Sequence, residues 1–175
     1  NVANGKTVNV TQTLLGGTNA THFDLVGISN TAAVTANITK ADLTVNLTGH
    51  TTNKYTFTYG DNVSVPFAVT NPVAGETIKI ILEYSGTYAD GTALAATTTP
   101  PTKAGTFTVT AKIDAADANA SNYALKTGTG ILTSATVEIK KATLTITANA
   151  HNTEYGTAPS AIGNSGVTYT GFVNG

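Results

Sequence analysis

Apolar and polar side chains alternate with a period of two along much of the chain. The alternating stretches are residues 43–47, 55–59, 65–69 and 107–113. Such alternation predicts β-strands that turn one face towards a core and the other towards water. Residues 77–84 are the most apolar stretch and predict a central strand, and residues 133–139 predict a closing strand.

Turn signals separate these stretches. They are Gly60-Asp61, Asn71-Pro72, Ala74-Gly75, residues 89–91 and residues 103–105. Residues 97–101 contain two prolines and indicate a loop or a sheet edge. About seven short strands with such spacing predict an all-β protein of tandem immunoglobulin-like β-sandwich repeats, elongated as an array. The alternative is a set of β-grasp-like units, which need a crossing helix, yet only residues 114–118 suggest a helical turn.

The chain repeats itself. Residues 38–45, Ile-Thr-Lys-Ala-Asp-Leu-Thr-Val, return as residues 139–146, Ile-Lys-Lys-Ala-Thr-Leu-Thr-Ile. The period is about a hundred residues, the length of one small domain. Further matches join Tyr59-Gly60 to Tyr155-Gly156, residues 73–75 to 173–175, residues 7–11 to 106–110, and residues 21–25 to 121–125.

The repeat divides the chain into three parts. We expect the C-terminal half of a β-repeat domain in residues 1–38, a complete domain in residues 39–140, and the N-terminal half of a following domain in residues 141–175. The junction at residues 138–144 has no Gly, Pro or Ser linker, so neighbouring units should be held stiffly.

The two half units invite a prediction about assembly. A segment of about 35 residues rarely buries a core by itself. We therefore expect residues 142–175 of one copy to pack against residues 1–38 of the next, head to tail, which gives open filaments when the contacts do not close. Such a composite domain would lack the residues that match 76–99. The alternative is that the 175 residues are a window on one longer continuous chain.

The amino-acid composition excludes several classes of partner and chemistry. Charged residues make up only 11% of the chain, the net charge is −1, and no basic stripe is present, so nucleic acid is not an expected partner. The chain has no Cys, which excludes disulfides and thiol chemistry. No apolar run reaches the length of a membrane span, so membrane insertion is not expected, and no signal peptide or sorting signal is recognised.

No set of residues suggests catalysis, and we expect no enzyme, metal or cofactor. His22, His50 and His151 are the only imidazoles, and the latter two occupy equivalent places in the repeat. Asp114 and Asp117 are the closest acidic pair, but no calcium-loop pattern surrounds them.

Two kinds of modification are candidates. Six Asn-x-Ser/Thr sequons are possible glycosylation sites: Asn9, Asn19, Asn37, Asn46, Asn62 and Asn119. Lys40 and Lys141 begin equivalent strands and are candidates for a Lys–Asn side-chain crosslink, with Glu76, Glu83 or Glu138 as the proton shuttle. The competing interpretation is that these lysines are solvated junction residues.

Aromatic side chains are the remaining candidate binding groups, because a ring face can stack on a sugar. Most of the seven tyrosines fall on core-facing positions of the alternating stretches. Tyr88 lies in the turn-rich segment 87–91 and is the tyrosine expected to be exposed and to contact a ligand.

The repeat motifs resemble a known family. Residues 141–148 (Lys-Ala-Thr-Leu-Thr-Ile-Thr-Ala), Glu154-Tyr-Gly156 and residues 169–175 resemble the start of an MBG-type domain, and residues 104–110, 121–125 and 139–142 look like its second half. Residues 5–11 and 21–25 are similar to the tail of a YDG-type domain. Such domains form tandem arrays in large bacterial surface adhesins and haemagglutinin-like exoproteins.

The resemblance implies an extracellular location, on the bacterial cell surface or in a secreted fibre, and no catalytic residues. We therefore expect a structural repeat segment of a fibre or stalk, whose partners are copies of itself or adjacent repeats. The alternative is an adhesin module that binds host glycan or mucin through exposed loops.

Overall fold

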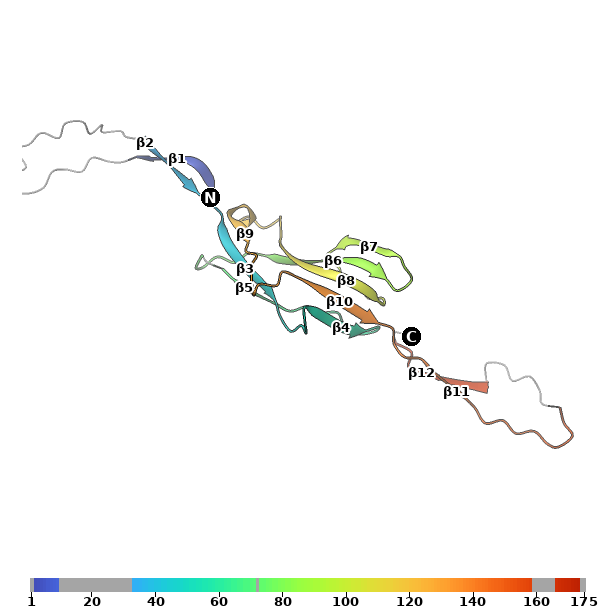
Figure 1. Cartoon of the computed structure of the whole chain (residues 1–175). Coiled ribbons are helices and arrows are strands. Elements are labelled where there is room, and N and C mark those ends of the chain that lie inside the picture. The colour runs from blue at the N-terminus through green and yellow to red at the C-terminus, as the bar shows by residue number, and fades with distance from the viewer. Residues whose placement is uncertain (1, 10–32, 72, 159–165, 174–175) are drawn as a thin grey trace, which may run out of the picture. The chain divides into compact units, whose positions relative to one another are not determined.

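The computed structural model describes residues 2–9, 33–71, 73–158 and 166–173, and its regular elements are β-strands (Figure 1). They are β1 (Ala3–Asn9), β2 (Ala33–Ile38), β3 (Ala41–Leu47), β4 (Lys54–Thr58), β5 (Phe67–Thr70), β6 (Ile80–Tyr88), β7 (Ala93–Thr97), β8 (Gly105–Ile113), β9 (Tyr123–Leu125), β10 (Ser134–Lys140), β11 (Thr145–Ala148) and β12 (Val167–Thr170). A 3-10 turn, Ala120–Asn122, lies just beyond the predicted helical turn. The predicted all-β class is confirmed.

The strands form several small, open sheets. The largest has the order β4-β10-β8-β6-β7, a second has the order β5-β3-β9, and β1-β2 and β11-β12 form two-stranded sheets. Two pairs are parallel, β10 with β4 and β3 with β9, so the sheets are mixed. The stretch predicted to be a central strand corresponds largely to β6, which lies inside the largest sheet with β8 on one side and β7 on the other. That prediction is confirmed.

The described residues cluster into two compact units. The first comprises Asn1–Thr44, Thr70–Lys79 and Ile113–Lys126. It holds the β1–β2 hairpin and the parallel pairing of β3 with β9, in which Ala41 lies opposite Tyr123. Leu43 (0% exposed), Tyr123 (2%) and Ile78 (5%) form its buried apolar centre.

The second unit comprises Val45–Val69, Ile80–Lys112 and Thr127–Gly175 and contains the largest sheet. Its buried apolar residues follow the predicted period of two: Val45, Leu47, Tyr55, Val63, Val65, Tyr84, Phe107, Val109, Ala111, Ala135, Val137 and Ile139. Phe67 and Val69 depart from the pattern and are 39% and 41% exposed. They belong to β5, an edge strand, where a neighbour covers only one side.

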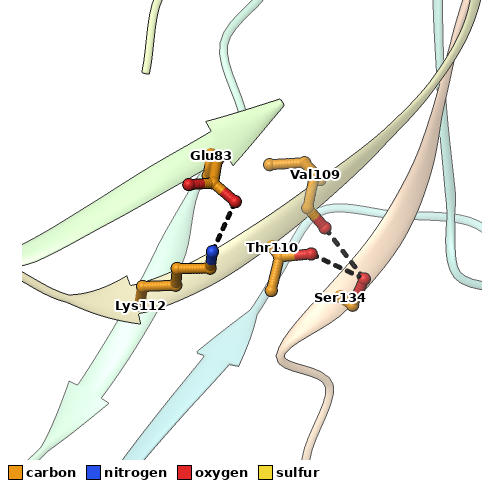
Figure 2. Close-up of polar contacts among 5 residues, drawn as sticks. All are labelled: Glu83, Val109, Thr110, Lys112 and Ser134. Carbon is orange, nitrogen blue, oxygen red and sulfur yellow. Dashed lines mark hydrogen bonds and ion pairs between the residues drawn. The ribbon is translucent and has the colours of Figure 1, made fainter. Parts of the chain in front are cut away.

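Polar side chains tie β6, β8 and β10 together in the second unit (Figure 2). The Ser134 hydroxyl donates to the Val109 carbonyl oxygen at 3.1 Å and lies 3.1 Å from the Thr110 hydroxyl. Lys112 and Glu83 form an ion pair between β8 and β6. These contacts sit on the wet face of the sheet, which is where the alternation places polar residues.

The C-terminal hairpin repeats a pairing of the longer central segment. β11 pairs with β12, just as β3 pairs with β5 in the central segment. Thr145, the first residue of β11, lies 101 positions after Thr44 of β3. The hydrogen bond that follows each first strand also recurs. The N–H of Thr48 donates to the carbonyl of Pro66 at 2.9 Å, and that of Asn149 donates to Gly166 at 2.8 Å.

The N-terminal hairpin repeats the pairing of β8 with β10. Val8 lies opposite Val34 in the hairpin, and Val109 lies opposite Ala135 in the large sheet. From Val8 to Val109 and from Val34 to Ala135 the distance along the chain is 101 positions in both cases. The register therefore aligns residue 8 with 109, two residues away from the match drawn on sequence alone.

The Tyr-Gly turn is the third repeated feature. Gly60 and Gly156 both have positive φ, 102° and 90°, and each turn is closed by a backbone hydrogen bond. The bonds run from Asp61 to Thr58 at 2.9 Å and from Thr157 to Glu154 at 3.1 Å. The residues before the two turns differ, because Lys54–Thr58 form β4, paired with β10, while residues 150–154 form no strand.

Candidate functional site

A cavity of about 640 Å³ lies within the second unit, between the ends of strands and the C-terminal segment. It is lined by Tyr59, Tyr88, Ala89, Asp90, Lys103, Ala104, Lys141, Ala142, Leu144, Gly171, Phe172 and Val173. The lining combines three aromatic rings with one carboxylate and two ammonium groups. This composition suits the binding of a ligand with an apolar face and hydroxyl groups better than it suits catalysis.

The turn between β6 and β7 shapes one wall of the cavity. The N–H of Gly91 donates to the carbonyl of Tyr88 at 2.9 Å, and the N–H of Tyr88 donates to Thr92 at 2.8 Å. Asp90 accepts the N–H of Thr92 at 2.8 Å. Hydrogen bonds from Thr92, together with the nearby charge of Lys103, lower the pKa of Asp90. The carboxylate is therefore a fixed acceptor of the turn.

Tyr88 is half-buried, not exposed as its turn-rich neighbourhood predicted. Its ring packs edge-to-face on Phe107, with centroids 5.3 Å apart and an interplanar angle of 73°. The absence of a side chain at Gly105 permits this packing, since a Cβ there would lie 2.8 Å from the Tyr88 Cα. Sequence reasoning missed this because the contact joins residues on different strands.

Lys141 lines the same cavity as Tyr88, whereas Lys40 is an exposed residue between β2 and β3. The three carboxylates suggested as proton shuttles have other partners. Glu83 pairs with Lys112, Glu138 binds Lys54 at 2.8 Å, and Glu76 accepts the Tyr123 hydroxyl at 2.5 Å. The crosslink remains a prediction for both lysines.

The sequons lie in different surroundings. Asn62 is exposed next to the Tyr-Gly turn, whereas Asn46 is half-buried on β3. Asn37 accepts the N–H of Gly5 at 3.0 Å, and Asn119 is half-buried before the 3-10 turn. Asn19 and the side chain of Asn9 lie outside the described residues.

His50 and the acidic pair Asp114 and Asp117 make local structural contacts. The Nδ1 of His50 accepts the N–H of Asn53 at 3.3 Å, while His151 is exposed and His22 lies outside the described residues. Asp114 binds the Lys79 ammonium at 2.7 Å and Asp117 accepts the Lys79 N–H at 2.7 Å. These bonds lower the pKa of both carboxyls. No group of three His, Cys, Asp or Glu residues able to hold a metal occurs among the described residues.

The second candidate site is a set of exposed apolar residues. Their equivalents in the central repeat are buried. Leu43 and Val45 are 0% exposed, but Leu144 and Ile146, one repeat later, are 47% and 58% exposed. Ile139 is 3% exposed and its equivalent Ile38 is 44% exposed. The repeated tyrosines show the same contrast: Tyr59 is half-buried, and Tyr155 is fully exposed. We call Leu144, Ile146 and Tyr155 the open row.

Comparison of the chain with protein-family models, with curated proteins and with solved structures gives no match.

Proposed function

We propose that this chain is a non-enzymatic, structural β-repeat segment of an extracellular bacterial fibre or stalk, built of immunoglobulin-like units. The observation that carries the proposal is the recurrence of β8–β10 pairing in β1–β2, and of β3–β5 pairing in β11–β12. A backbone pattern that repeats while its side chains vary is typical of repeat proteins that form extended arrays.

The strands at either end of the central repeat suit a load-bearing role. β3 has the parallel neighbour β9, and β10 lies between parallel β4 and antiparallel β8. A pull along either strand shears these hydrogen bonds together, since the bonds of a ladder run across the strands. Only Thr39 and Lys40 separate β2 from β3, so little slack precedes the load.

Pulling the full chain by its ends in a force spectrometer tests this proposal. The role predicts one cooperative rupture that releases the residues between Ala41 and Lys140, about 330–360 Å of chain. The matched variant Lys54→Met removes the ion pair to Glu138 and leaves the β4–β10 backbone ladder, so its rupture should stay cooperative. Gradual extension without a rupture would contradict a load-bearing role.

A second candidate function is glycan binding at the cavity, favoured by the rings of Tyr88 and Phe172 beside Asp90 and Lys103. Aromatic faces stack on sugars, and the charged groups can bind hydroxyls. Titration of the chain with mucin-type oligosaccharides tests it. Phe172→Ala should abolish any binding while Tyr155→Ala, which changes an exposed ring absent from the cavity lining, should leave it intact.

No helix in the described part of the chain is both long and apolar enough to cross a membrane.

A further inference from the structure

Hydrogen bonds hold the Tyr-Gly turn of the central repeat at the end of β10. The N–H of Tyr59 donates to the Lys140 carbonyl oxygen at 2.7 Å, and the N–H of Asp61 donates to the Thr58 carbonyl oxygen at 2.9 Å. The Asp61 carboxylate accepts the N–H of Thr58 at 2.7 Å. The turn therefore has a defined position where the chain leaves β10 towards the C-terminal hairpin.

The Val173 side chain packs on Gly60 of this turn. A Cβ at Gly60 would lie 3.0 Å from the Val173 Cβ and 3.6 Å from its Cγ2, so the missing side chain makes room for the valine. Val173 is 38% exposed, against 70% for Phe172 beside it. Gly156, the repeat equivalent of Gly60, also has a positive φ, but a Cβ there would meet no described atom within 4 Å. Gly60 thus serves the turn and a contact.

A second glycine brings Val173 back towards the central repeat. Gly171 has a φ of 98°, and a Cβ there would meet the Thr143 carbonyl oxygen and lie 3.6 Å from the Leu144 Cα. Residues 171–173 therefore lie close against residues 143–144, the connection between β10 and β11.

The junction before the central repeat has a valine at the same place. Val73 and Val173 each lie three residues beyond the end of a matching strand, β5 or β12. In the first unit Val73 lines a cavity of about 190 Å³ together with Val2 and Ile38, which belong to the N-terminal hairpin and its first residue. At both junctions the valine thus lies beside the repeat that precedes its own.

We propose that Val173 fixes the joint after the central repeat: its side chain binds Gly60 and keeps the β11–β12 hairpin in one orientation against the end of β10. This inference rests on the proposed stalk function, and it names the contact that would make the joint stiff. A short connection limits how far two units can separate, but their rotation is limited by side-chain contacts across the joint. Only residues 141–144 separate β10 from β11, so a single contact can set their orientation.

A pair of spin labels across the joint tests this contact, since the chain has no Cys and labels attach only where a Cys is introduced. Thr108→Cys on β8 and Thr147→Cys on β11 replace exposed residues of the second unit. Pulsed electron spin resonance of the full chain then measures the distribution of distances between the labels. We expect one narrow distribution, which Gly60→Ala should make about twofold broader because the added Cβ displaces Val173.

Gly91→Ala is the matched control. Gly91 has a φ of 88°, close to the 102° of Gly60, but a Cβ there would meet no described atom within 4 Å. This variant strains a turn of the same repeat without touching the joint, so the distribution should stay narrow. Val173→Ala removes the contact from the other side, without strain at Gly60, and should broaden the distribution as Gly60→Ala does.

A broad distribution in the unmodified chain would overturn the proposal. So would equal widths for Gly60→Ala and Gly91→Ala, or a width that Val173→Ala leaves unchanged. The force measurement keeps this inference distinct from the proposed function, because rupture of the central repeat depends on the backbone ladders of β3 and β10 and not on the joint. A loose joint with a cooperative rupture would contradict the Val173 contact alone, whereas gradual extension would contradict the load-bearing role.

Discussion

The side-chain oxygen of Asn46 accepts the backbone N–H of Leu132 at 2.7 Å. One residue further along, the N–H of Leu47 donates to the Leu132 carbonyl at 2.7 Å. Together the two bonds attach the end of β3 to the segment that leads into β10, all within the second unit. A residue that reads as a glycosylation sequon is thus a structural bridge.

Replacing Asn46 by Ala should destabilise the chain by about 1–3 kcal/mol, because the N–H of Leu132 loses its acceptor in a half-buried place. The exposed sequon Asn62 provides the control, and Asn62→Ala should change the free energy of unfolding by under about 0.5 kcal/mol. Urea denaturation measures both. In a glycosylating host, mass mapping should find sugar on Asn62 and not on Asn46; the reverse pattern would contradict the bridge.

Gly86 is required by its neighbours on β8. A Cβ at Gly86 would meet the Thr106 carbonyl oxygen and lie 2.6 Å from the Phe107 Cα, both of them backbone atoms. Gly128 has nearly the same φ, 155° against 153°, but open space around it. Gly86→Ala should therefore cost about 1–3 kcal/mol more than Gly128→Ala. Equal thermal shifts for the two variants would show that φ alone matters.

Acid should weaken the attachment of Lys79 to Asp114 and Asp117. The Lys79 ammonium lowers the pKa of Asp114, and the Lys79 N–H lowers that of Asp117, both from 3.8. A lowered folded-state pKa stabilises the fold above the unfolded value, and this contribution is lost as the pH falls through the folded pKa. The melting temperature should therefore drop below pH 3.8.

The Asp114→Asn/Asp117→Asn double variant separates this contribution from the rest of the chain's titration. Its melting temperature should depend less steeply on pH below 3.8 than that of the unmodified chain. Lys79→Met should show an intermediate slope, because it removes the ammonium and keeps the backbone N–H. Identical slopes for all three proteins would show that these bonds do not stabilise the fold.

Apolar residues on the matching strands β3 and β11 should respond differently to truncation in the dilute chain. Leu47 is 0% exposed, and Leu47→Ala should cost about 2–5 kcal/mol. Ile146 is 58% exposed, and Ile146→Ala should leave the main unfolding transition of the dilute chain within about 0.5 kcal/mol. Calorimetry at low protein concentration measures both. A large loss for Ile146→Ala would mean that the residue is buried within a single chain.

The amino-acid sequence predicted the parts of the fold that depend on local pattern. Alternation located β3 and β8 with the correct buried faces, and the repeated Tyr-Gly pair located two turns with the same hydrogen bond. The pairing of residues 7–11 with 106–110 missed the register by two positions. Polar and apolar residues alternate there, so a shift of two keeps every side chain on its face and leaves the pattern unchanged.

Other features depend on contacts that no local pattern contains. The parallel pairing of β4 with β10 joins strands far apart in the chain. The half-buried state of Tyr88 depends on Phe107, and the exposure of β5 depends on its edge position. The exposed open row was implied only by comparing one repeat with the next.

Force spectroscopy of the 175-residue chain tests the central claim most directly. A load-bearing stalk segment should give one cooperative rupture that releases about 330–360 Å of chain between Ala41 and Lys140. Gradual extension of this part of the chain, with no rupture, would contradict the claim.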